Sequence, residues 1–94
     1  PAWWREHHHD IVRESWRAAA AAPRSARPWL VLALAFERVG RDGDAAAAYH
    51  RVTHLFPGHR IARKAIDRIR SRHGDALPEA TPDDRLRNEF GLEP

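Results

Sequence analysis

Helix-ending residues recur along the chain at a constant separation of 34 residues. This step joins residues of the same type at several pairs of positions: Pro23 and Pro57, Gly40 and Gly74, and Phe56 and Phe90. Internal periods of 20 to 50 residues are typical of proteins built from stacked supersecondary units. The spacing therefore predicts a repeat architecture, in which each unit ends at about the same point of its own sequence.

Between these breaks, apolar residues recur every three or four positions, as on one face of a helix, and no segment alternates as a strand does. We predict an all-α fold of about five helices, at residues 2–22, 26–39, 44–56 and 59–72, with a short helix that ends near Phe90. The second is apolar on nearly all sides and is expected to be the most buried. Thr81 is expected to cap the last helix.

The segment 26–59 resembles a tetratricopeptide repeat, a 34-residue helix-turn-helix unit. Its seven signature positions are occupied by the same or similar residues, namely Trp29, Leu32, Ala33, Phe36, Ala45, Tyr49 and Pro57. The resemblance implies antiparallel helix pairs stacked into an α-α superhelix. The two alanines would allow the helices to approach closely, and Gly40 would form the turn between them.

The flanking segments match the repeat less well. Residues 60–94 form a degenerate repeat and C-terminal cap, because Arg63 replaces the tryptophan and because Pro78 and Pro82 prevent a full second helix. Residues 1–23 are the N-terminal helix, in the register of a preceding second helix. We therefore expect one TPR-like domain over residues 1–94, in which both flanks cover the central repeat.

Composition limits the possible functions. The 94 residues carry a formal net charge of +3 with a sequence pI near 10.5, and Lys64 is the only lysine. An alanine- and arginine-rich bias of this kind is typical of GC-rich, bacterial-like coding, and acidic residues are interleaved with the arginines. Nucleic-acid binding is therefore the least favoured partner class. The lack of cysteine and of a long apolar segment leads us to expect a cytoplasmic protein without membrane association.

The resemblance also implies where a partner binds. Ligands of tetratricopeptide repeats usually contact the first helix of each pair, and the matching positions here are Arg27, Leu30, Leu34, Glu37 and Arg38 in the central repeat and Ile61, Lys64, Arg68, Ser71 and Arg72 in the degenerate one. Leu30 and Leu34 would form an apolar floor, and Lys64, Arg68 and Arg72 a basic wall. We expect a non-enzymatic adaptor or scaffold that binds a protein segment, and the basic wall would suit an acidic segment. Alternatively, the N-terminal helix covers the two leucines.

Two other functions remain open at this point. Trp3, Trp4 and Trp16 give the N-terminal helix more apolar bulk than a solvent-facing cap needs, which indicates a possible homo-oligomer. An arginine-rich nucleic-acid-binding domain is the less favoured alternative.

The histidines His50 and His54 share one helical face, at a spacing used in metal sites. Their register relative to the expected core places them outside, so they are weak candidates, and no metal or other cofactor is expected. No serine, threonine or carboxylate lies in a catalytic motif.

Overall fold

The computed structural model describes residues 2–92, which form helices and turns without a strand. The expected limits of the domain at residues 1 and 94 lie outside this range. The elements are α1 (Ala2–Ala21), α2 (Ala26–Arg38), α3 (Asp42–Leu55), α4 (Arg60–His73), the 3-10 turn η1 (Gly74–Ala76) and α5 (Asp83–Phe90). The predicted all-α fold with five α-helices is confirmed.

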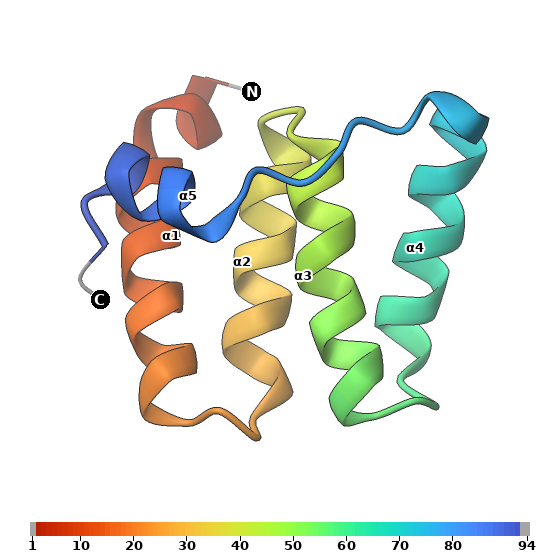
Figure 1. Ribbon diagram of the computed structural model, residues 1–94, viewed down its shortest axis with the longest axis horizontal. Helices are drawn as coiled ribbons and strands as arrows, with labels where there is room; N and C mark the ends of the chain where they lie inside the picture. Colours follow the sequence, from red (N-terminus) through yellow and green to blue (C-terminus); the bar gives the residue numbers. More distant parts are fainter. Residues whose placement is uncertain (1, 93–94) are drawn as a thin grey trace.

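The four long helices lie side by side in chain order, each antiparallel to the one before it (Figure 1). Helix α2 packs against α1 and α3, and α3 packs against α4. The turns after α2 and after α4 contain Gly40 and Gly74, whose φ angles are 82° and 57°. Glycine adopts a positive φ angle without a steric penalty, so the same requirement for glycine in the turn recurs after 34 residues.

Small residues lie where the helices approach closely. Ala33 of α2, Ala45 of α3 and Ala62 of α4 are fully buried, so neighbouring backbones can come together at these points. Larger side chains fill the space beside them, among them Val12, Leu32, Phe36, Tyr49, Val52, Ile66, Ile69, Leu86 and Phe90. All five α-helices therefore contribute to one core.

The expectation that α2 is the most buried helix is wrong. Helix α3 buries more residues, whereas Val31 and Leu34 of α2 are exposed and Trp29 is only partly buried. Helix α2 is flanked by α1 and α3, but neither covers the side that carries Leu34. Some apolar residues of α2 thus face the core, whereas Val31 and Leu34 lie on an open face.

Residues 77–82, here named the strap, carry the chain from α4 across α3 and α2 to α5, which packs against α1 (Figure 1). The strap lies directly on the start of α3 at Gly43. A Cβ atom there would overlap the carbonyl oxygen of Pro78 and would lie 2.8 Å from that of Glu79. The expected break after α4 is confirmed, and the chain beyond it returns to the first two helices.

Thr81 does not cap α5, contrary to the sequence expectation. The helix begins at Asp83, and no side chain caps it. Instead, the Thr81 amide donates to Asp44 Oδ1 at 2.5 Å and its hydroxyl donates to Asp44 Oδ2 at 3.0 Å. Because this aspartate is buried at the start of α3, Thr81 fixes the strap to that helix.

Arg41 joins the strap, α3 and α5. Its guanidinium donates to Asp44 at 2.9 Å, to Thr81 at 3.2 Å and to both carboxylate oxygens of Glu89. It also lies over the rings of Phe36 and Phe90, 5.4 and 5.2 Å from their centroids. Burial lowers the pKa of Arg41, but the hydrogen bonds to Glu89 and Asp44 outweigh this and raise it above its ordinary value.

Candidate functional site

An open groove of about 480 Å³ lies between α2 and α4. Leu34, Glu37 and Arg38 of α2 line one side, and Arg68 and Arg72 of α4 line the other. All five belong to the binding set predicted from the sequence. We name this feature the α2–α4 groove.

The remaining predicted residues do not line the α2–α4 groove. Leu30 is partly buried against the core, and Arg27, Ile61, Lys64 and Ser71 are exposed. Leu34 is 36% exposed, so α1 does not cover it. The apolar part of the groove is therefore narrower than predicted.

The basic wall is tied to an acidic residue that the sequence reading placed beside it but did not pair with it. Arg68 donates hydrogen bonds from Nε and Nη2 to the two carboxylate oxygens of Glu37, at 3.0 and 2.9 Å. Arg72 donates from Nη2 to one of the same oxygens, at 2.7 Å. The hydroxyl of Tyr49 donates to the same carboxylate at 3.0 Å. Two of the three residues of the predicted basic wall, Arg68 and Arg72, therefore belong to a network that joins α2, α3 and α4.

These contacts shift the pKa values of two groups away from neutral pH. Burial raises the pKa of Glu37, but the hydrogen bonds from Arg68, Arg72 and Tyr49 outweigh it, so that the pKa falls to about 2. Burial of the Tyr49 phenol, together with the neighbouring Glu37 charge, raises its pKa to about 12. Glu37 is thus a carboxylate and Tyr49 a neutral donor at neutral pH.

This network predicts a specific loss of stability in acid. Because the folded pKa of Glu37 is depressed, its contribution is complete above the unfolded value, near 4.5, and is lost as the pH falls through about 2. The shift sets a ceiling of about 3 kcal/mol. The partly exposed arginine partners are screened, so we expect about 1–2 kcal/mol.

Urea unfolding at pH 2 to 6 measures this effect as the difference between the wild-type protein and Glu37→Gln. The difference should shrink in acid, whereas Glu14→Gln, at an exposed position on α1, should follow the wild-type curve. A difference that stays constant with pH would contradict the assignment.

A second polar cluster lies next to the Glu37 network. Asp42 of α3 is buried and lies 2.6 Å from Nε2 of His73 and 3.6 Å from Nη2 of Arg72. Neither Asp42 nor His73 is among the residues predicted from the sequence. They lie 31 residues apart, so no local pattern indicates that they meet.

The weak metal candidates are both exposed on α3, as their register predicted. His50 lies beside a different groove, on the side of α3 and α4 lined by Arg63 and Arg70. Among residues 2–92, no group of three or more histidine, cysteine or acidic side chains gathers at one point.

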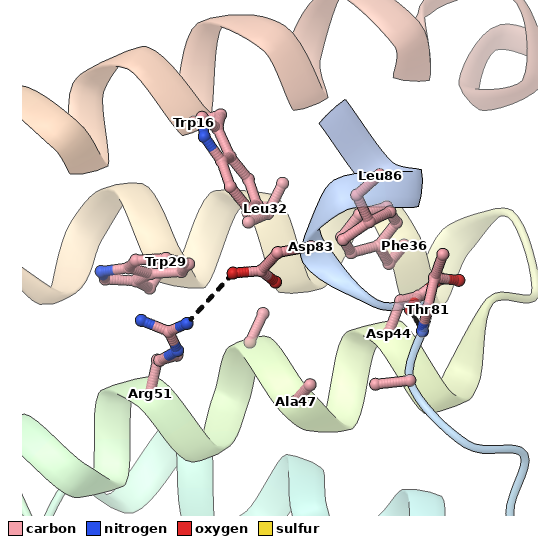
Figure 2. Close-up of a pocket in the computed structure, with 12 residues that line it drawn as sticks. Trp16, Trp29, Leu32, Phe36, Asp44, Ala47, Arg51, Thr81, Asp83 and Leu86 are labelled. Atoms are coloured by element: carbon pink, nitrogen blue, oxygen red, sulfur yellow. Dashed lines mark hydrogen bonds and ion pairs between the residues drawn. The ribbon is translucent and has the colours of Figure 1, made fainter. Parts of the chain in front are cut away.

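A smaller cavity of about 70 Å³ lies under the strap, between α1, α2 and α3 (Figure 2). The rings of Trp16 and Trp29 pack edge to face, with 6.1 Å between their centroids. The Arg51 guanidinium lies 4.9 Å from the Trp29 ring centroid. Arg51 also approaches Asp83 at 3.8 Å. The space is sufficient for a few water molecules and far below the size of a typical ligand site.

In the described part of the chain, no helix combines the length and the apolar character needed to cross a bilayer.

Comparison with known families matches residues 2–58 to the bacterial transcriptional activator domain. The match contains α1, α2 and α3, so the α2 side of the groove lies inside it, and α4 and the strap lie outside it. Neither the curated proteins nor the solved structures contain a significant match. The helical, repeat-like character of the family agrees with the fold, and more than half of the chain is matched. This chain therefore belongs to the bacterial transcriptional activator domain family.

Proposed function

We propose that this chain is a non-enzymatic protein-interaction module of a transcriptional activator. It binds a segment of another protein in the α2–α4 groove, as a TPR-like domain would. The observation that carries the proposal is an exposed aliphatic side chain, Leu34, in an open groove whose other lining residues are charged.

The composition of the groove supports a protein partner. Val31 is exposed three residues before Leu34, so the two side chains are neighbours on the surface of α2. Arginine is enriched at protein interfaces, where an apolar contact surrounded by polar groups is common. Three arginines and one glutamate line the groove, and the positive excess favours an acidic segment.

Site-specific crosslinking tests the proposal. A photoreactive amino acid is placed at Leu34 and, as a control, at His54, which is exposed on α3 and does not line the groove. In bacterial cells we expect a crosslinked partner from position 34 that is absent from position 54. The triple variant Lys64→Ser, Arg68→Ser, Arg72→Ser should lose that product while remaining folded. Identical products from both positions, or an unaffected triple variant, would reject this groove as the binding site.

Homo-oligomerisation is the second candidate function. Trp4 and Trp16 pack against the core, and Trp3 is exposed and stacks on His7 at 4.5 Å. One exposed tryptophan near the start of α1 is a narrower basis than the three that the sequence offered. Sedimentation at several protein concentrations decides this point, because a strict monomer eliminates the candidate.

A further inference from the structure

Glu37 accepts hydrogen bonds from two arginines of α4 that line the groove together with it. Arg68 contacts it through a two-pronged interaction, and Arg72 shares one of its oxygens. The Glu37 side chain is only 10% exposed, whereas those of Arg68 and Arg72 are 52% and 46% exposed. The negative charge thus lies below the surface, and the guanidinium groups lie above it.

Both guanidiniums keep donors for a ligand. The hydrogen bonds of Arg68 to residues 2–92 use Nε and Nη2, and that of Arg72 uses Nη2. A guanidinium has five N–H donors in a rigid plane, so the Nη1 groups of both side chains keep their donors with respect to these residues. Arg38 adds a third guanidinium to the same groove.

We propose that Arg68 and Arg72 form an oxyanion receptor for a side-chain carboxylate of the bound segment, and that Glu37 is its positioning residue. An aliphatic side chain next to that carboxylate packs on Leu34. This inference rests on the proposed function, since it names the chemistry of the segment that the α2–α4 groove binds.

Charge and geometry favour a carboxylate. Planar guanidinium groups bind carboxylates through paired hydrogen bonds, which are stronger than bonds between neutral groups. Asp42 lies 3.6 Å from Arg72 and lowers the local positive charge, but it is buried at the start of α3. The adjacent Leu34 then selects acidic residues that have an aliphatic neighbour.

The effect of Glu37 distinguishes orientation from simple charge attraction. If only net charge matters, Glu37→Gln makes the groove more positive and tightens the binding of an acidic peptide. If orientation matters, the same change frees both arginines and weakens binding, because ordering them then opposes association. The two mechanisms therefore predict opposite signs.

The probes are two synthetic peptides, acetyl-Leu-Glu-Glu-Leu-amide and its neutral counterpart acetyl-Leu-Gln-Gln-Leu-amide. They are titrated into the full chain while the Nε–H resonances of Arg68 and Arg72 and the methyl resonances of Leu34 are followed by NMR. We expect the acidic peptide to shift both the arginine Nε–H resonances and the Leu34 methyl resonances. Its affinity should be at least about tenfold higher than that of the neutral peptide. Glu37→Gln should weaken binding of the acidic peptide by about fivefold or more.

Glu14→Gln is the matched control, because it removes the same charge from an exposed position on α1, and it should not weaken binding. Arg68→Lys keeps the charge but removes the two-pronged geometry, and it should weaken binding much as Glu37→Gln does. Circular dichroism confirms that each variant is folded, and Arg68→Lys alone decides the question if Glu37→Gln does not fold. Unchanged or tighter binding by the folded variants overturns the proposal.

Other outcomes separate the receptor from the groove. Equal affinity for both peptides, with shifts at Leu34, overturns the oxyanion receptor and leaves the groove as a binding site. No saturable shift with either peptide also overturns the receptor, and the crosslinking experiment then decides the groove separately. Stronger, steeply salt-dependent shifts with a DNA duplex or with inorganic phosphate would assign the arginines to phosphate and overturn the carboxylate assignment.

Discussion

Replacing Phe36 with alanine is expected to lower the free energy of unfolding by about 3–5 kcal/mol, the usual cost of truncating a fully buried aromatic side chain. Phe36 is 1% exposed. Its ring meets that of Phe90 at 6.0 Å and lies beneath the guanidinium of Arg41. The substitution therefore leaves a cavity in the central repeat and also removes support from α5. A domain of this size has about 5–15 kcal/mol of stability in total, so the variant should be close to unfolding.

Urea denaturation followed by far-UV circular dichroism measures the loss. Val31→Ala is the matched control, because Val31 lies on the same helix but is exposed, and its truncation should cost well under about 1 kcal/mol. A loss at Phe36 as small as that at Val31 would contradict the central place of Phe36 in the core.

The sequence predicted the helices well because their limits depend on local chemistry. Prolines and glycines end the helices, and the spacing of apolar residues selects the buried face of each one. Ala45, Tyr49 and Val52 recur at three- and four-residue steps on one face of α3 and are buried, and Leu86 and Phe90 are buried on one face of α5. Each of these signals lies within a few residues of the helix end or helix face that it determines, so the sequence alone is enough to detect it.

Trp29 shows where the resemblance to a tetratricopeptide repeat is less informative than the surroundings in the structure. It matches the first signature position, but the ring is only partly buried, beside Trp16 and Arg51. In a longer array, a complete preceding repeat would lie on that side. Here Trp16 of α1 contacts it, and the strap and the start of α5 line the same cavity, so burial at this position depends on elements that the pattern does not describe.

The sequence predicted only part of the candidate site, because this site also depends on contacts between elements. The resemblance to tetratricopeptide repeats assigns ligand contacts to fixed positions on the first helix of each pair, and this placed Leu34, Arg38 and Arg72 at the groove. The ion pairs depend on rotamers and on the distance between helices, so Glu37 and Arg68 were predicted as neighbours of a ligand and not as partners of each other. The strap could not be predicted either, because its contact with Gly43 joins segments about 35 residues apart.

Replacing Arg41 with methionine is expected to lower the free energy of unfolding by about 3 kcal/mol, because it leaves a buried carboxylate without its cationic partner. The Asp44 side chain is only 6% exposed, and after the change its remaining donors are both on Thr81. Methionine keeps much of the apolar volume over Phe36 and Phe90 but loses the charge and every hydrogen bond to Glu89. The loss should therefore appear first as weaker attachment of the strap and α5.

Denaturation measures the global effect, and amide hydrogen exchange in α5 measures the local one. Arg17→Met, at an exposed position on α1, should change neither by more than about 0.5 kcal/mol. The double variant Arg41→Met, Asp44→Asn should be more stable than Arg41→Met alone, because the buried charge is then gone. The double variant could instead lose as much free energy of unfolding as Arg41→Met and Asp44→Asn lose together, or the amides of α5 could exchange no faster in Arg41→Met. In either case the attachment of the C-terminal segment does not depend on this ion pair.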